Sequence, residues 1–328
     1  MLDPKKPRIL VALGGRSSER AVSIASGREV VLALEKLGYQ TAILDVGSGK
    51  LLQTPEIDLL EKDAQKMPRV ANLPLIDIKR HFELVFIAMH GRFGEDGGLQ
   101  AIFQENGIRY TGSTPLPSAL AMDKEFSKKI LQASGVAVLE TKVAERENEK
   151  SPLPFPVVIK PVNQGSSVGV CICENEADFS LGLKRSLEFC KRAIIEPYIK
   201  GKELTCAVLE SESGEPRALP VIEIIPNSKF FDYKAKYDGT TQEIVPAKID
   251  DQLAKSVQEI AVKAHRLLSC RHFSRVDMVV DQNSNIFVLE VNSIPGLTSE
   301  SLFPKAAKAG GFDFEKLIDH IVKIALKR

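Results

Sequence analysis

The sequence predicts a mixed α/β protein with two or three domains, and three observations carry this prediction. The chain has 328 residues, more than one hydrophobic core usually holds. In its N-terminal third, apolar strand-like segments alternate with loops and helical segments, which is typical of a parallel sheet with functional groups at the carboxyl ends of its strands. Nearer the C-terminus, two apolar, β-branched segments flank a run of turn formers at 281–285, which predicts an antiparallel hairpin.

The composition excludes several classes of protein. Hydrophobic residues make up 44% of the chain and charged residues 27%, as in ordinary globular proteins. The formal net charge of +1 provides no strong field for nucleic acid or a membrane surface, and no apolar run approaches the roughly 20 residues that span a bilayer. Five scattered cysteines without a CxxC pair indicate neither zinc nor disulfides. We therefore expect a cytoplasmic protein that binds neither nucleic acid nor membrane.

The N-terminal third contains the alternating elements. The helical segment at 22–37 has apolar residues at helical spacing, and Gly38 is a stop signal at its end. Residues 47–80 carry no clear pattern. The expected elements are a strand at 8–14, a helix at 22–37, strands at 39–46 and 84–89, a helix at 100–106 and a short strand at 109–111.

Two loops lie where these strands end, GGRSSE at 14–19 and HGRFGEDG at 90–97. The first lacks the glycine spacing of a dinucleotide-binding loop. Glu19 is either a carboxylate that points into a cleft or a first-turn acid favoured by the helix dipole. His90 is either a site residue or a strand-end histidine bonded to the backbone.

The middle of the chain predicts a flap and a hinge. A Pro-rich break at 112–118 marks a candidate boundary. The turn NQGSSVGV, between two strands, is either a plain hairpin or a flap whose N–H groups lie over phosphates. The backbone from Glu196 onward could hydrogen-bond an adenine edge, with Glu203 accepting from a ribose. The expected elements are a helix at 119–134, a strand at 156–161 bearing Lys160, a strand at 170–173, a helix at 179–190 and a strand at 193–199.

The C-terminal part predicts a third domain. A long polar and aromatic loop at 227–246 suits a closing lid, because loops of this length in compact domains are usually functional or mobile. The expected elements are strands at 205–209 and 219–224, an amphipathic helix at 250–268, the hairpin and a helix at 316–326.

The hairpin at 275–291 places charged side chains on one face. If its turn is centred on Asn283-Ser284, Arg275 faces Asn292 and Asp277 faces Glu290. Two carboxylates and an amide oxygen suit Mg²⁺, although a cross-strand salt bridge is the simpler interpretation. The loop at 293–299 offers free N–H groups beside them. The opposite, apolar face is expected to hold Val276, Met278, Val280, Leu289 and Val291.

Seven segments, in order from residue 14 to residue 304, resemble the D-alanine–D-alanine ligase family of the ATP-grasp superfamily. The resemblance implies three domains, at 1–116, 117–202 and 203–328, with ATP held between two antiparallel sheets. The segments are GGRSSERAVSIASG, HGRFGEDGGLQ, YTGS with AMDK, VVIKPVNQGSSVGV, IEPYIKGKELT, FFDYKAKY, and RVDMVV followed by LEVNSIPGLTSESL.

The resemblance also implies which residues bind the metal ions and which bind ATP. Asp277, Glu290 and Asn292 would hold two Mg²⁺ ions, with Mn²⁺ as an alternative metal and a role for a monovalent cation left open. Pro197 departs from the acidic or basic residue of many members, and only its carbonyl is needed. The ATP-binding residues would be Lys124, Lys160, Ser166, Ser167, Glu196, Pro197, Tyr198, Ile199, Glu203 and Lys236.

The implied reaction joins two D-alanine molecules for peptidoglycan precursor synthesis. ATP would phosphorylate the first carboxylate, and the amine of the second amino acid would attack the acyl phosphate. Arg275 and the Gly296 N–H would stabilise the oxyanion. The base for the attacking amine stays open. Glu19 would bind the first ammonium, Ser301 and the Leu302 N–H the second carboxylate, His90 would lie near both substrates, and Ser166 with Tyr237 would latch the lid to Glu19.

Two alternatives remain. A related ATP-grasp ligase could use D-lactate, D-serine or an L-amino acid as the acceptor, although tyrosine at position 237 goes with D-alanine in this family. A nucleotide-binding regulator that has lost activity is the second alternative, and the charged residues that the chemistry needs argue against it. A homodimer is the expected assembly.

Overall fold

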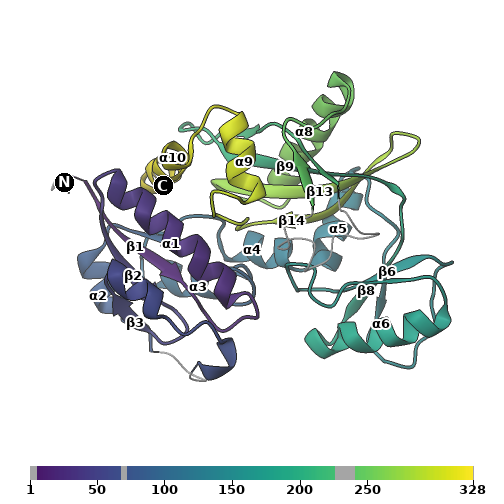
Figure 1. Cartoon of the computed structure of the whole chain (residues 1–328), viewed down its shortest axis with the longest axis horizontal. Coiled ribbons are helices and arrows are strands. Elements are labelled where there is room, and N and C mark those ends of the chain that lie inside the picture. The colour runs from purple at the N-terminus through teal and green to yellow at the C-terminus, as the bar shows by residue number, and fades with distance from the viewer. Residues whose placement is uncertain (1–5, 68–71, 226–240, 328) are drawn as a thin grey trace.

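The computed structural model describes residues 6–67, 72–225 and 241–327 (Figure 1). The predicted lid, with Lys236 and Tyr237, lies outside these ranges. The described chain forms three sheets, of four, six and four strands, each with its own helices. Helix α10, late in the chain, packs against α1 near its beginning.

The N-terminal sheet is parallel apart from one edge strand. Its order is β3-β2-β1-β4, and β1 pairs in parallel with both β2 and β4. Both faces of β1 are buried, as expected for a parallel sheet with helices on each side. The elements are β1 (Arg8–Leu13), α1 (Arg20–Lys36), β2 (Gln40–Asp45), β3 (Lys50–Leu52), two 3-10 turns (Thr54–Leu59 and Ala64–Lys66), α2 (Leu75–His81), β4 (Leu84–Ile87) and α3 (Gly98–Glu105).

The central sheet is antiparallel, with the order β5-β8-β6-β7. α6 covers one face, and Gly182 allows its backbone to approach the side chains of Cys171 and Cys173 closely. These cysteines are therefore packing residues of one sheet face. The elements are β5 (Lys142–Ala144), β6 (Val157–Pro161), β7 (Cys171–Cys173), α6 (Glu176–Phe189) and β8 (Ala193–Pro197).

The C-terminal sheet contains the predicted hairpin. Its order is β12-β11-β9-β13-β14, with β10 on the edge of β9. α4, α5 and α8 pack on one face, and α9 and α10 connect the sheet to α1 (Figure 1). The elements are α4 (Pro115–Met122), α5 (Lys124–Ala133), β9 (Gly201–Glu210), β10 (Pro216–Ala218), β11 (Ile222–Ile225), β12 (Gln242–Ile244), α8 (Asp251–Leu267), β13 (Phe273–Asp281), β14 (Ile286–Asn292), α9 (Leu302–Ala309) and α10 (Phe314–Leu326).

Two predictions about elements are wrong in detail, and one helix was not predicted. The helix expected at 119–134 is two helices, because Asp123 is extended and caps α5 by accepting the Glu125 and Phe126 N–H groups (both 3.1 Å). The short strand at 109–111 is an isolated bridge from Tyr110 to Val85. Helix α9 carries no signal that we used.

The hairpin register is correct near the charged residues and shifts toward the turn. Arg275 pairs with Asn292 and Asp277 with Glu290, as predicted. A bulge follows, so that Met278 pairs with Val288. The prediction that Leu289 joins the apolar layer is therefore wrong: Val288 is buried there, and Leu289 is half-buried beside the charged face.

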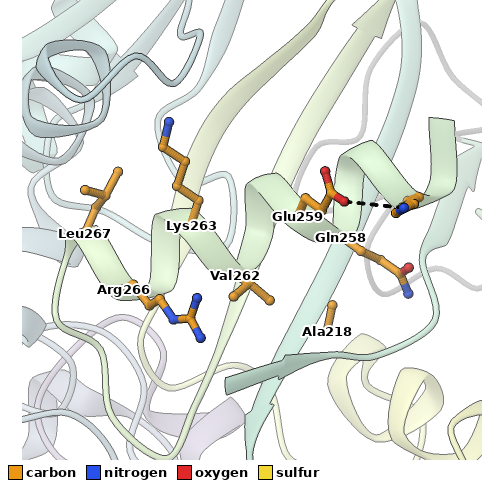
Figure 2. A pocket seen from close by; sticks show the side chains of 8 residues that line it. Ala218, Gln258, Glu259, Val262, Lys263, Arg266 and Leu267 are labelled. Carbon is orange, nitrogen blue, oxygen red and sulfur yellow. Dashed lines mark ion pairs between the residues drawn. The ribbon is translucent and has the colours of Figure 1, made fainter. Parts of the chain in front are cut away.

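An open groove of about 630 Å³ runs along α8, away from the charged face of the hairpin (Figure 2). Ala218 and Val262 form its floor, and long polar side chains surround it. Lys255 and Glu259 pair across one helical turn at 4.0 Å, and both are mostly exposed. Such pairs contribute under about 1 kcal/mol, so the groove is a solvated helix surface.

Candidate active site

A cleft of about 590 Å³ lies where the three sheets meet, between the central and C-terminal antiparallel sheets. The N-terminal sheet contributes the loops that follow β1 and β4, so residues far apart in the sequence line one space. The predicted site residues that line it are Glu19, His90, Lys124, Lys160, Ser166, Ser167, Glu203, Arg275, Asp277, Glu290, Asn292, Gly296, Ser301 and Leu302.

On the central sheet, β8 carries a fully buried carboxylate, Glu196. Lys160 lies 3.0 Å from its Oε2, while Lys128 pairs with Oε1 and the Thr141 hydroxyl donates to Oε1 at 3.0 Å. Burial alone raises the pKa of a carboxyl, but the two lysines together lower the pKa of Glu196 to about 2. Glu196 is therefore ionised and orients Lys160 toward the cleft.

The segment that follows Glu196 uses some of its backbone groups for hydrogen bonds within the central sheet. Pro197 ends β8, and the Tyr198 N–H donates to the Pro156 carbonyl at 3.0 Å. Pro197, Tyr198 and Ile199 are half-buried. Glu203 follows on β9 and lines the cleft.

Lys124 connects the flap, which is the turn between β6 and β7, to the C-terminal sheet. Its ammonium donates to the Gln164 carbonyl at 2.6 Å and lies 3.2 Å from the Glu290 carboxylate. The Lys124 side chain is 9% exposed, so this ion pair is shielded from solvent. The flap base, α5 and β14 thus meet at one ammonium group.

The hairpin holds Asp277 in a network of donors. Arg275 binds it through two hydrogen bonds of 2.9 and 2.8 Å, Thr205 donates at 2.6 Å, and Asn292 Nδ2 donates at 3.1 Å. Burial alone lowers the pKa of a guanidinium, but pairing with Asp277 raises the pKa of Arg275. Arg275 is therefore always charged, and Asp277 and Glu290 face the same cleft as its guanidinium.

Glu19 stands at the N-terminus of α1, where α1 and the flap meet. Ser166 donates its hydroxyl proton to Glu19 Oε1. Oε2 is buried and has no hydrogen-bond partner in the described part of the chain. A Cβ at Gly165 would lie 2.8 Å from Oε2, so only glycine lets the flap approach this closely. A buried carboxylate oxygen without a partner is suited to a cationic ligand.

His90 is held by both ring nitrogens. Nδ1 lies 3.2 Å from the Ile294 carbonyl and Nε2 lies 2.8 Å from Ser26 Oγ. Since a carbonyl only accepts, Nδ1 carries the proton and Nε2 accepts from the serine. Burial lowers the pKa of His90 more than the nearby Glu19 raises it, so the ring is neutral.

The loop after β14 closes the far end of the cleft. Ser301 Oγ lies 2.7 Å from Thr298 Oγ1 and accepts the Thr298 N–H at 3.3 Å. Ser301 is the residue before α9, and Leu302 is its first residue. Because the first N–H groups of a helix lack intrahelical partners, this end can bind a carboxylate.

Sequence reasoning missed several residues of the site. Lys128 follows Lys124 by one helical turn on α5, and this spacing could have indicated that both lysines lie on the same side of the helix. Thr205 lies opposite Asp277 because β9 pairs with β13, and the sequence gives no local signal for this pairing. Glu95 belongs to the HGRFGEDG loop, of which only His90 was selected. Arg20, beside Glu19, forms a buried bidentate pair with Asp45 at 2.7 and 3.0 Å that fixes the loop after β1.

A cleft between two antiparallel sheets, lined by lysines, a flap, a buried acid and a guanidinium, defines an ATP-dependent carboxylate–amine ligase with the ATP-grasp fold. The family models described as D-ala D-ala ligase N-terminus and D-ala D-ala ligase C-terminus match residues 8–113 and 130–323. The chain belongs to the D-alanine–D-alanine ligase family.

Individual relatives are similar over nearly the whole chain. D-alanine–D-alanine ligase from Desulforudis audaxviator is 40% identical and covers 98% of this chain and 99% of its own. Two solved structures each cover 98% of this chain. The ATP complex of D-alanine–D-alanine ligase from Bacillus anthracis has a TM-score of 0.79, 30% identity and 98% coverage of its own chain. The VanG D-Ala:D-Ser ligase from Enterococcus faecalis has a TM-score of 0.81, 31% identity and 100% coverage.

Proposed function

We propose that this chain joins two D-alanine molecules through an acyl phosphate, coupled to conversion of ATP to ADP and phosphate, for peptidoglycan precursor synthesis. The observation that carries the proposal is the set of groups that line one cleft. Lys124, Lys160 and the flap line it together with Arg275, Asp277 and Glu290, and Ser166 of the flap binds Glu19, whose second oxygen has no partner among the described residues.

The ATP end would act through position and charge. Lys124 and Lys160 bind phosphate oxygens, and the N–H groups of the flap at Ser166 and Ser167 lie over them. The backbone from Glu196 to Ile199 binds the adenine edge, and Glu203 accepts from the ribose. Lys236 is a further phosphate contact in this proposal. The buried Glu196 keeps Lys160 charged and oriented before ATP arrives.

Asp277, Glu290 and Asn292 fit Mg²⁺. Two carboxylates on adjacent strands and an amide oxygen are hard oxygen donors, which Mg²⁺ and Mn²⁺ prefer. Asn292 uses its amide nitrogen toward Asp277, which leaves its oxygen for a metal. Bound magnesium, as two ions, neutralises phosphate charge during transfer. We leave a monovalent cation as an additional activator to be tested.

The amino acid end would bind two zwitterions. Glu19 Oε2 pairs with the first ammonium, while Arg275 and the Gly296 N–H stabilise the oxyanion that forms on attack. Ser301 and the Leu302 N–H bind the second carboxylate, and His90 lies beside both substrates as a neutral ring. Ser166 and Tyr237 latch the lid through Glu19, and the Ser166–Glu19 hydrogen bond is the part of this latch within the described residues.

The test is phosphate release from Mg²⁺-ATP, with D-alanine, D-lactate plus D-alanine, D-serine plus D-alanine, and L-alanine compared side by side. We expect release with D-alanine alone, and the dipeptide in the mass spectrum. ATP binding without release in any arm would contradict the proposal and favour a non-catalytic regulator.

A second acceptor, D-serine, is favoured by one observation. The VanG D-Ala:D-Ser ligase resembles this chain as closely in fold as the D-alanine–D-alanine ligases do. Release that requires D-serine in addition to D-alanine would keep the fold and the acyl phosphate and change only the acceptor site, around Ser301 and the lid.

We also propose a cytoplasmic homodimer with three domains, at 1–116, 117–202 and 203–328. The free thiols of all five cysteines suit a reducing compartment. In the described part of the chain, no helix has the length and apolar character needed to cross a membrane. Light scattering on the purified protein measures the assembly directly.

A further inference from the structure

Glu95 is a cleft carboxyl to which neither the sequence motifs nor the proposed steps assign a task. It lies on the loop between β4 and α3, lines the same cleft as Glu19 and Arg275, and is 9% exposed. We infer that Glu95 accepts the proton that the ammonium group of the second amino acid must lose before it attacks the acyl phosphate. This inference rests on the proposed function.

The Glu95 carboxyl is held in place but lacks a cationic partner. Its Oε2 accepts the Gly91 N–H at 2.6 Å, and no lysine or arginine in the described ranges lies within ion-pair distance of it. Ser293 Oγ lies 3.5 Å from its carbonyl, which connects this loop to the segment leaving β14. Glu95 is therefore fixed in the cleft lining without an ion-pair partner among the described residues.

The cationic groups nearest to Glu95 form ion pairs with other carboxylates. Arg275 is bound to Asp277 through two hydrogen bonds, and Lys124 is shared by Glu290 and the Gln164 carbonyl. Glu19 would be occupied by the first ammonium. Burial, and then the neighbouring Glu19 carboxylate, raise the pKa of Glu95 well above its usual range, which makes its carboxylate a stronger proton acceptor.

His90 is the obvious competitor, and its geometry excludes it from this role in the described conformation. Its Nδ1 proton goes to the Ile294 carbonyl, and its Nε2 accepts from Ser26. Both ring nitrogens are therefore occupied, and burial disfavours the charged form that a base must become. Glu95 has a carboxylate oxygen beyond the one that Gly91 uses.

The proton balance closes without another reactant. Glu95 carboxylate takes one proton from the ammonium, and the resulting neutral amine attacks the carbonyl carbon of the acyl phosphate. The carbon–oxygen bond to phosphate then breaks, and the departing phosphate takes the second proton from the nitrogen. Glu95 returns its proton to solvent, so each turn releases dipeptide, phosphate, ADP and one proton.

The test separates the two half-reactions in Glu95→Gln, whose amide oxygen can still accept the Gly91 N–H. Hydroxylamine is uncharged at neutral pH, so it traps an acyl phosphate as hydroxamate without needing a base. We expect dipeptide formation to fall about 10²- to 10³-fold. Hydroxamate formation from ATP and D-alanine should change by less than about threefold.

Asp96→Asn is the matched control, because Asp96 is the adjacent carboxyl and caps Gly98 at 3.0 Å without lining the cleft. It should leave both rates near those of the wild type. Unchanged dipeptide formation in Glu95→Gln would overturn the inference, as would an equal loss of both products, which indicates a structural role. Wild-type protein that makes neither product would refute the proposed function itself, and the inference with it.

Discussion

Individual carboxylates in the cleft differ in what surrounds them. Glu196 has two lysines and a hydroxyl and Asp277 has a bidentate arginine, whereas Glu19 has, among the described residues, a serine hydroxyl at one oxygen and no partner at the other. A buried charge is tolerated when it is paired and hydrogen-bonded. Glu196 is therefore fully partnered before any ligand arrives, whereas Glu19 has an oxygen suited to a cationic ligand.

Lys128→Met tests the buried lysine pair at Glu196. Removing one partner of a buried ion pair typically costs about 3–5 kcal/mol, and here Lys160 compensates in part, so we expect a loss of about 3 kcal/mol. Lys160 would then be held more tightly by Glu196, which should raise KM for ATP. Lys129→Met removes an exposed pair with Glu125 on the same helix and should cost under about 1 kcal/mol. Urea unfolding compares them, and equal midpoints would contradict the assignment.

Glu196 also predicts acid sensitivity. Its pKa is lowered from 4.5 to about 2 in the folded protein, so its contribution is fully present above the unfolded value and is lost as the pH falls through the folded value. A shift of this size corresponds to a contribution on the order of 3 kcal/mol. Urea midpoints measured from about pH 5 to about pH 2 should fall, and in Lys128→Met the fall should be smaller, because the folded pKa of Glu196 then lies nearer to the unfolded one. The same profile in both proteins would refute the coupling.

Glu19→Gln tests the ammonium site. The amide still accepts the Ser166 hydroxyl but offers no charge, so kcat/KM for D-alanine should fall about 10- to 100-fold, as expected for loss of a hydrogen bond to a charged group. KM for ATP should change less, because the amide keeps the hydrogen bond from Ser166 that holds the flap. Steady-state kinetics with D-alanine and ATP varied in turn measures both effects. A change confined to the ATP parameters would contradict the assignment of Glu19 to the ammonium site.

At the scale of elements, the site depends on two local backbone features, the turn of the flap near Glu19 and the bulge of the hairpin after Asp277. Ser166 and Ser167 both have positive φ, 51° and 56°, which turns the flap so that Gly165 faces Glu19. The bulge after Asp277 keeps Glu290 opposite Asp277 while Val288 fills the core. A turn and a bulge of one residue thus place the reactive groups on the cleft side.

Gly165→Ala should displace the flap. The new Cβ would lie 2.8 Å from Glu19 Oε2, and a displacement of about 1 Å in an active site can cost up to 10²-fold in rate, so we expect kcat to fall about 10- to 100-fold. Gly310→Ala is the control, since its Cβ would meet its neighbours at 3.3 Å far from the cleft. Stopped-flow turnover with saturating substrates measures both, and equal rates would mean that the flap has room to adjust.

At the scale of the whole molecule, the cleft exists only where three sheets meet. β1 and β4 bring the loops of Glu19 and His90, β6 and β8 bring Lys160 and Glu196, and β13 and β14 bring Asp277 and Glu290. Helices α9 and α10 pack the C-terminal sheet against α1 (Figure 1). A ligand that touches several of these sheets should therefore stabilise the entire fold.

Mg²⁺-ATP should raise the melting temperature. At a ligand concentration of 100 times Kd, binding stabilises the folded state by about 2.7 kcal/mol. Chelation with EDTA should remove most of this gain, because phosphate charge would then face Asp277 and Glu290 directly. Asp277→Asn, followed by differential scanning fluorimetry with and without Mg²⁺, should show a smaller magnesium-dependent shift. A full shift in EDTA would contradict the metal assignment.

Much of this protein is determined by local sequence. Apolar runs and stop signals predicted β1, α1, β4 and α10, because buried strands and amphipathic helices have short-range periodicity. Alternation of charged and apolar residues predicted the pairing of Arg275 with Asn292 and of Asp277 with Glu290. Motif order was sufficient for the ATP-grasp fold and the family.

Other features were decided only by the tertiary structure. The Glu196–Lys128 pair, Thr205 beside Asp277, and Glu95 facing Glu19 each join residues from different elements, and no local pattern encodes such distances. The bulge that moves Leu289 toward the cleft depends on packing of Val288 against α8 and β13. Sequence by itself determined which chemical groups the protein carries, and folding decided which of them share a desolvated space, because burial and neighbouring charge set the state of each carboxylate.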